Sequence, residues 1–284
     1  MAKTQDIKRR IKSVKNTMQL TRAMRMVAAA KLRRAQERMM HARPYVHGMT
    51  RVLRSLAARA NPEDHPLLQE HGDKKVELVV LTADKGLCGA FNSGIIRLAE
   101  NFAAEQQGKE LTWNAVGKKG RDYFRRRFEL KRERADLFRT VEFDAAKEIA
   151  ADLIERYIDG ELDQIHLIFN EFKSAIQAKP VALQLLPIEP EQLADGEVAD
   201  EYIYEPSAKE LFAELLPHYV ENQIFQAMLE SVAAEHAARM TAMESATNNA
   251  GELIESLTLT MNRVRQASIT TEIIEVVSGA EALN

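Results

Sequence analysis

The 284-residue sequence lacks several features that whole classes of protein need. It contains a single cysteine, Cys88, which excludes an internal disulfide and any multi-cysteine zinc site and suits a reducing compartment. It has no apolar run of about 18 residues, so we do not expect it to span a membrane. Residues 1–10 lack the apolar stretch of a secretory signal. The seven histidines show no metal-binding spacing, and we expect neither a metal nor a cofactor.

Aromatic residues, proline and glycine are scarce at the two ends of the chain. The first 44 and the last 59 residues contain no Phe, Tyr or Trp, so all 17 aromatic residues lie between Tyr45 and Phe225. After Pro217 there is no proline, and Gly251 is the only glycine before Gly279. A thick globular core uses large side chains, whereas long helices avoid proline and glycine. The sequence therefore predicts a globular middle between two helical ends.

The net charge of −3 conceals an uneven distribution of charge. Residues 1–59 hold 16 basic and two acidic side chains, a net +14, whereas the remainder holds 23 basic and 40 acidic ones, a net −17. A basic segment of this length is typical of one that binds nucleic acid, anionic lipid or an acidic protein. The alternative is a solvated helix face that pairs with the acidic parts of the same chain.

Residues 3 to about 57 are predicted to form one long helix, within an N-terminal segment of residues 1–60. Apolar or small residues recur there at steps of three and four, the spacing of a coiled coil. Thr21 and Arg25 interrupt the pattern, and Pro44 is expected to kink the helix or loosen a turn. The positions in the pattern are Ile7, Ile11, Val14, Met18, Ala28, Leu32, Ala35, Met39, Ala42, Val46, Met49, Leu53 and Leu56.

A second helical segment covers residues 208–284, with a helix predicted from 208 to about 278. The same spacing recurs, although His236, Arg239, Thr260 and Thr271 weaken it. Two long helices that flank one domain pack most economically as an antiparallel pair. The positions in this second pattern are Leu229, Val232, Met243, Ala246, Ala250, Leu253, Leu257, Val264, Ala267 and Ile274.

The middle segment, residues 75–205, is predicted to be a Rossmann-like α/β domain, because apolar strands alternate with helices, which favours a parallel sheet. The predicted fold class is therefore α/β with long helices: an antiparallel two-helix coiled coil formed by both termini, plus an inserted Rossmann-like α/β domain. The predicted strands are 76–81, 111–116, 164–172 and 181–188, and the predicted helices are 93–107, 118–128 and 144–158.

Two glycine-containing turns could be mistaken for phosphate sites. The segment DKGLCG at residues 84–89 follows the first strand, but Ala90 and Phe91 stand where a phosphate loop needs Lys and Ser or Thr. A dinucleotide fingerprint fails because no third glycine completes it. We interpret this segment as a tight strand-to-helix turn and GKKGR at residues 117–121 as a basic loop. No local pattern marks a catalytic residue, and we expect none.

Three segments resemble the gamma subunits of F-type ATP synthases. They are TRAMRMVAAAK at residues 21–31, DKGLCG at residues 84–89 and RQASITTEIIEVVSGA at residues 265–280. The resemblance extends over essentially the whole chain, and the C-terminal segment is highly specific. The chloroplast type of this subunit carries a regulatory cysteine pair, whereas this chain has only Cys88, so the bacterial type fits better.

The resemblance implies a set of partners and a role as a rotor subunit that is not itself an enzyme. The coiled coil would sit inside a ring of three alpha and three beta subunits, and the far end, with the epsilon subunit, would rest on the membrane-embedded c-ring. Proton flow would turn the c-ring and this subunit together. The implied location is the cytoplasmic face of the bacterial plasma membrane, as a peripheral protein without nucleic acid or cofactor.

The resemblance also implies which residues meet the partners. Six would contact the beta subunit, five would form an apolar bearing at the tip, and three would form a foot on the c-ring. In that order they are Met24, Arg25, Lys31, Arg239, Arg265 and Gln266; Ile269, Ile273, Ile274, Val276 and Val277; and Tyr202, Tyr204 and Glu205.

Two other functions are compatible with parts of the sequence. A nucleic-acid-binding coiled coil would use the basic N-terminal helix on phosphates, but the remaining segments have no comparable basic run. An α/β-domain enzyme would place catalysts at strand ends, near Asp84 and Asn170, but would leave more than a third of the chain as unused helix.

Overall fold

The computed structural model describes residues 2–57, 65–175, 177–188 and 208–281. The chain divides into two units, Ala30–Ala238 and a smaller one that combines Met1–Ala29 with Arg239–Asn284. Two long helices, α1 (Ala2–Ala57) and α5 (Ala208–Glu281), contribute to both units. The three-segment division predicted from the sequence stays a prediction.

Both long helices occur where the sequence predicts them. α1 is rich in Ala, Arg and Met, and α5 is rich in Ala and Glu; all of these residues have high helix propensity. α1 stays helical through Pro44, and α5 stays helical through Pro217. Most apolar positions of the predicted pattern in α1 are buried, including Ile11, Ala28 and Leu32.

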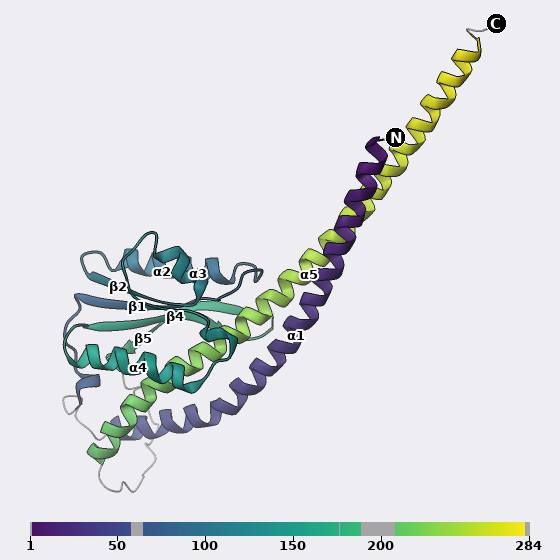
Figure 1. Cartoon of the computed structure of the whole chain (residues 1–284). Helices are drawn as coiled ribbons and strands as arrows, with labels where there is room; N and C mark the ends of the chain where they lie inside the picture. Colours follow the sequence, from purple (N-terminus) through teal and green to yellow (C-terminus); the bar gives the residue numbers. More distant parts are fainter. Residues whose placement is uncertain (1, 58–64, 176, 189–207, 282–284) are drawn as a thin grey trace, which may run out of the picture. The chain divides into compact units, whose positions relative to one another are not determined.

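Within the smaller unit, α1 and α5 run antiparallel (Figure 1). The Oγ1 atoms of Thr21 and Thr247 lie 2.7 Å apart, and Arg25 Nη1 lies 3.1 Å from Glu244 Oε1. From the first contact to the second, the residue number rises in α1, from 21 to 25, and falls in α5, from 247 to 244. The predicted antiparallel arrangement is therefore confirmed.

The larger unit contains a five-stranded sheet of order β3-β2-β1-β4-β5 (Figure 1). β1, β2, β3 and β4 are parallel, and β5 pairs antiparallel with β4. The strands are β1 (Lys75–Leu81), β2 (Glu110–Val116), β3 (Leu130–Arg134), β4 (Gln164–Phe172) and β5 (Ala178–Leu186), and the remaining helices are α2 (Phe91–Glu105), α3 (Lys118–Phe124) and α4 (Phe143–Ile158), with short 3₁₀ turns at Pro66–Leu68 and Leu137–Arg139.

Helices cover both faces of the sheet. α2 and α3 lie on one face, and α4 lies on the other (Figure 1). The main core contains buried side chains from β1 and β4, from α4 and from α5, such as Leu81, Leu167, Leu153 and Val220. These strands are buried over nearly their whole length because both of their faces are covered.

Three predictions about details were wrong. β3 was missed because its sequence, Leu-Lys-Arg-Glu-Arg, has one apolar residue, as an edge strand can. β5 is antiparallel rather than parallel, since the short link between Phe172 and Ala178 cannot make a crossover. Three predicted coiled-coil positions near the end of α5 are exposed rather than packed: Leu253, Ala267 and Ile274.

Candidate functional site

The paired ends of α1 and α5 contain polar contacts where the apolar pattern breaks. Thr21 is buried, and its hydroxyl meets that of Thr247, which also donates to the carbonyl oxygen of Met243 at 2.7 Å. The Thr21 hydroxyl likewise has the carbonyl oxygen of Met18 as an acceptor at 3.0 Å, so neither hydroxyl is left without a partner inside the interface. Arg25, which the family resemblance places against the beta subunit, is paired with Glu244 of its own chain.

Beyond this pairing, the C-terminal part of α5 exposes apolar side chains. The two contacts at Thr21 and Arg25 set a register that places the start of α1 opposite residues near 267. All five predicted bearing residues lie beyond that point, and each exposes about half of its side chain or more: Ile269 49%, Ile273 57%, Ile274 59%, Val276 72% and Val277 54%. Apolar residues exposed in such numbers on one helix mark an interaction surface.

Two polar residues stand just before this apolar surface. Arg265 and Gln266 are both exposed, and neither side chain forms a hydrogen bond or ion pair with a residue of the described chain. The backbone carbonyl of Gln266 accepts from the Thr270 hydroxyl at 3.0 Å, as part of the helix. Both side chains are therefore available to a partner.

The other predicted contact residues are distributed along the helices. Met24 is half-buried, Lys31 is exposed, and Arg239 is half-buried with contacts inside the chain. Arg239 and Arg265 are separated on α5 by roughly 40 Å at 1.5 Å per residue. The structure thus shows surfaces along a helix pair rather than one compact site. The predicted foot, Tyr202, Tyr204 and Glu205, lies outside the described residues.

Residues 84–89 form a tight strand-to-helix turn, as predicted, and hydrogen bonds between side chains and backbone N–H groups hold it in place. Asp84 Oδ1 accepts from the backbone N–H groups of Lys118 and Asp136, each at 3.0 Å, which joins the ends of β1, β2 and β3. The backbone N–H of Ala83 donates to Asn92 at 2.9 Å. Asn170, the other strand-end candidate, is buried and donates to the carbonyl of Phe91 at 3.4 Å.

One residue of this turn was not singled out from the sequence. Leu87 has a φ of 61°, a left-handed conformation that costs energy for a leucine, and it is 65% exposed. Gly89 shares the left-handed region, with a φ of 55°. Sequence reasoning could locate the turn from its glycines, but not which residue would project from it.

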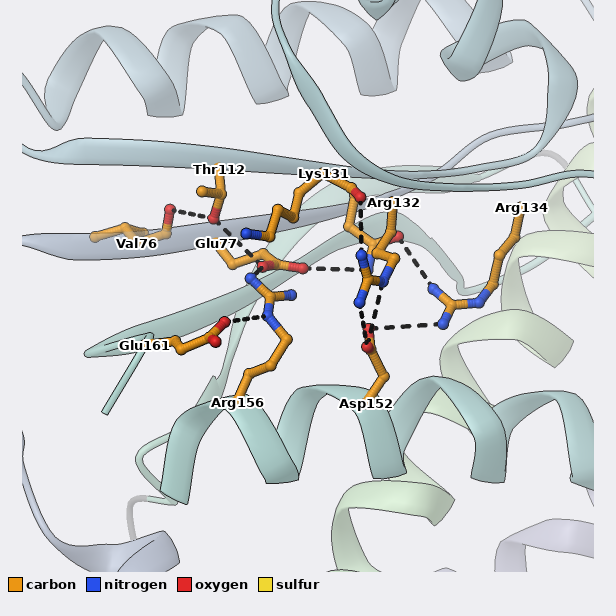
Figure 2. Close-up of polar contacts among 10 residues, drawn as sticks. Val76, Glu77, Thr112, Lys131, Arg132, Arg134, Asp152, Arg156 and Glu161 are labelled. Carbon is orange, nitrogen blue, oxygen red and sulfur yellow. Dashed lines mark hydrogen bonds and ion pairs between the residues drawn. The ribbon is translucent and has the colours of Figure 1, made fainter. Parts of the chain in front are cut away.

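A buried polar cluster joins α4 to the sheet, and sequence reasoning also missed it (Figure 2). Glu77 is fully buried in β1, and its Oε2 atom lies 2.6 Å from Arg156 Nη2. Asn114 donates to Glu77 at 3.1 Å, Thr112 at 3.3 Å, and Arg156 also binds Glu161 at 3.2 Å. An acidic residue inside an apolar strand was the available signal.

The electrostatics of this cluster indicate a structural role. Burial alone would lower the pKa of Arg156, but the carboxylates of Glu77 and Glu161 raise it. A neighbouring group joins Arg132 and Arg134 of β3 to Asp152 of α4, at 3.3 and 3.6 Å (Figure 2). Since the Glu77 carboxylate is already bound by three side chains, the cluster fixes α4 to the sheet instead of presenting a reactive group.

Histidines and carboxylates do not assemble a metal centre in the described ranges. His166 lies in β4 with its ring against that of Phe102, at 4.7 Å between centroids. Burial, with a smaller contribution from Lys109, lowers the pKa of His166 to about 4. It is therefore a neutral core histidine at pH 7. Among the described helices, none is both long and apolar enough to cross a membrane.

Comparison with known proteins places the chain in a family. The family described as ATP synthase matches residues 3–283. The ATP synthase gamma chain of Desulforamulus reducens is 50% identical over 285 aligned residues, covering 100% of both chains. The gamma chain of Geotalea uraniireducens is 47% identical, covering 100% of this chain and 99% of its own.

Solved structures agree with this relationship. The central-stalk and c-ring structure of the Tetrahymena thermophila mitochondrial ATP synthase matches with a TM-score of 0.61 and 27% identity, over 80% of this chain and 99% of that chain. A chain of the Euglena gracilis mitochondrial ATP synthase shares the fold, with a TM-score of 0.70 and 20% identity, over 99% of this chain and 95% of its own. The chain belongs to the ATP synthase gamma chain family.

Proposed function

We propose that this chain is the shaft that turns inside a ring of three alpha and three beta subunits and carries torque from the c-ring, without an active site of its own. The observation that carries the proposal is the apolar surface of α5 over residues 269–277, exposed where α1 no longer pairs with it. The α/β domain, together with an epsilon subunit, would rest on the c-ring.

An apolar tip suits a shaft that rotates within a sleeve. Hydrophobic contact is non-directional, so its free energy varies little as Ile273 or Val276 passes successive neighbours. Hydrogen bonds depend strongly on angle and would hold the shaft at particular orientations. An apolar bearing therefore permits rotation, while a few polar groups define where the shaft pauses.

Arg265 and Gln266 are the polar groups that we assign to such a pause. They are exposed and unpartnered within the described chain, and a loop of the beta subunit can bind them. Met24 and Lys31 are assigned to the acidic lever of the beta subunit, and Arg239 to a further polar contact. Arg25 contributes through its pair with Glu244, which positions it on the helix surface.

The foot assignment and the location complete the proposal. Tyr202, Tyr204 and Glu205 would contact the polar loops of the c-ring, which brings the domain to the cytoplasmic face of the bacterial plasma membrane as a peripheral subunit. No nucleotide binding by this chain is required, because the alpha and beta subunits would hold the nucleotides. The glycine turn at residues 84–89 has its acidic group occupied by backbone N–H donors.

The test is a paired substitution measured in the reconstituted complex. R265A/Q266A should reduce assembly or steady-state ATP hydrolysis by about tenfold or more, since one charge-assisted hydrogen bond contributes about 1.5–3 kcal/mol. The matched control is R97A/Q107A, which removes the same residue types from exposed positions of the α/β domain. Wild-type assembly and turnover of R265A/Q266A would refute the assignment, and ATP hydrolysis by the pure isolated chain would refute its lack of an active site.

A further inference from the structure

Several cations gather on α3 and on the turn that follows it. Residues 118–127 contain Lys118, Lys119, Arg121, Arg125, Arg126 and Arg127, against one acidic residue, Asp122. This concentration occurs in the part of the chain, residues 60–284, that is otherwise acidic, with a net charge of −17. We call Lys119, Arg125, Arg126 and Arg127 the α3 basic surface; all four are exposed.

Most of these cations have no anionic partner in the described chain. Lys118 pairs with Asp136 at 2.7 Å, and Arg121 pairs with Asp122 at 2.8 Å. In contrast, Lys119, Arg125 and Arg126 form no ion pair with any residue of the described ranges. Arg127 stacks over the ring of Tyr123 at 3.9 Å, which holds its guanidinium at the surface.

The cations act together on Asp122, the one acidic residue within residues 118–127. The hydrogen bond from Arg121 lowers the pKa of Asp122, and the charges of Lys119 and Arg126 lower it further. Lys119 of α3 and Arg126 of the turn that follows it therefore both lie near enough to Asp122 to act on its charge. Within residues 118–127, six cations stand against this one carboxylate, which Arg121 already binds, so this segment carries an excess of positive charge.

The apolar content of the surface decides which anionic partner fits. Stable protein interfaces have an apolar centre from which charged side chains are depleted. Here the only large apolar side chain exposed among residues 118–134 is Phe128, which is 36% exposed and stacks on Trp113. A cluster of flexible cations around one partly exposed aromatic ring matches the requirements of an anionic lipid surface instead.

The path of the chain places this surface toward the end of the sheet at which the parallel strands begin. α3 starts after the carboxyl end of β2 and returns, so that β3 begins opposite Trp113 in the middle of β2. The turn that holds Arg125, Arg126 and Arg127 thus lies toward the end of the sheet at which β1, β2 and β4 start. β5 finishes at that same end of the sheet, where Leu186 pairs with Ile165. In the sequence, the foot residues of the proposed function follow β5.

We propose that the α3 basic surface binds the anionic head groups of the phospholipid bilayer around the c-ring. The inference rests on the proposed function, because the foot on the c-ring is what brings this surface near the membrane. The binding is electrostatic and lies outside the torque path. It should weaken as salt shortens the Debye length from about 10 Å at 0.1 M to about 3 Å at 1 M.

The experiment uses the assembled complex in vesicles, because free α1 is itself strongly basic. A fluorophore is attached at an E129C substitution beside the surface, and Cys88 is buried and so protected from labelling. Quenching by a nitroxide carried on lipid head groups is compared in vesicles of neutral phosphatidylcholine and in vesicles that also contain phosphatidylglycerol. We expect quenching in the anionic vesicles and its loss at high salt.

The decisive variant is K119Q/R125Q/R126Q, and its matched control is R97Q/K147Q/K179Q, which removes three exposed cations from α2, α4 and β5. Each cation near an anionic membrane strengthens association by about fivefold, so the first variant should lower lipid association at least about tenfold. The control variant should leave lipid association unchanged. Both should assemble and hydrolyse ATP normally, which separates this outcome from failure of the proposed function. The inference is overturned if quenching is equal in the two variants. It is also overturned if only the first variant fails to assemble, because that result would indicate an acidic protein partner.

Discussion

Glu77 is the only acidic residue of strand β1, and its burial makes it dependent on Arg156. Taking two charges out of water costs free energy that their attraction and hydrogen bonds must offset. Removing one partner leaves the other charge buried and uncompensated. The pair therefore adds little net stability. Its main effect is to fix the position of α4 against the sheet, because apolar contacts are non-directional and specify a position less tightly.

We expect E77Q to lower the free energy of unfolding by about 3 kcal/mol, because the buried Arg156 charge loses its buried carboxylate and keeps only the half-exposed Glu161. Urea unfolding of the purified chain measures this. E161Q is the control, since Glu161 binds the same guanidinium from a half-exposed position and should cost under about 1 kcal/mol. A double E77M/R156M substitution should cost less than E77Q alone. Equal costs for E77Q and E161Q would contradict this account.

His166 predicts a dependence of stability on pH. Its pKa falls to about 4 in the folded chain from 6.5 in the unfolded one, so the unfolded state binds more protons between these values. Stability is therefore lost as pH falls through that window, by about 2 kcal/mol between pH 7 and pH 5 from this residue. H166F should reduce this loss in urea unfolding, whereas H41F, at an exposed position, should not. An unchanged pH dependence in H166F would refute it.

At the scale of elements, the polar contacts between α1 and α5 define the register that the apolar pattern leaves loose. Thr21 with Thr247 and Arg25 with Glu244 together place Val14 opposite residues 254 and 255. Counting from the two chain ends, the sequence predicts a partner for Val14 within residues 257–267, a range that begins about one turn further along. Ile254 is half-buried whereas Leu253 is exposed, which agrees with the shifted register.

Cysteine cross-linking checks this register directly. V14C/I254C should form a disulfide readily under mild oxidation, because the two positions face each other in the antiparallel pair. V14C/L215C, which a parallel pair would bring together, should form none. The native Cys88 is buried and provides no competing exposed thiol. A strong cross-link from position 14 to 215, or none to 254, would be incompatible with the structure.

The elements that the sequence predicted share a strong, repeated signal. The long helices and β1, β2 and β4 are specified by apolar spacing over many residues, and the resemblance at residues 265–280 identified their role. β3 carries no such signal, because an edge strand with mostly charged side chains looks like a loop. The Arg25–Glu244 pair and the Glu77 cluster join residues more than 30 positions apart, which no local pattern can specify.

At the scale of the whole molecule, charge is separated along the sequence rather than mixed. The net +14 of residues 1–59 stands against −17 in the remainder, yet few of these charges pair across the chain in the described ranges, Arg25–Glu244 being an exception. Most basic side chains of α1, including Lys8, Arg22 and Arg34, are exposed. An unneutralised cationic helix creates a field that attracts an acidic partner before contact.

This separation predicts the salt dependence of assembly. If α1 is guided into a ring lined by acidic groups, the association rate with isolated alpha and beta subunits should fall about tenfold or more from 0.05 M to 0.5 M salt. K8Q/R22Q/R34Q should slow association at low salt and flatten this dependence, while leaving dissociation nearly unchanged, because steering acts on the approach. R97Q/K147Q/K179Q removes the same charge from the α/β domain and should alter neither. Stopped-flow measurement of complex formation distinguishes the variants, and equal effects of both would show that net charge, not the charge of α1, guides assembly.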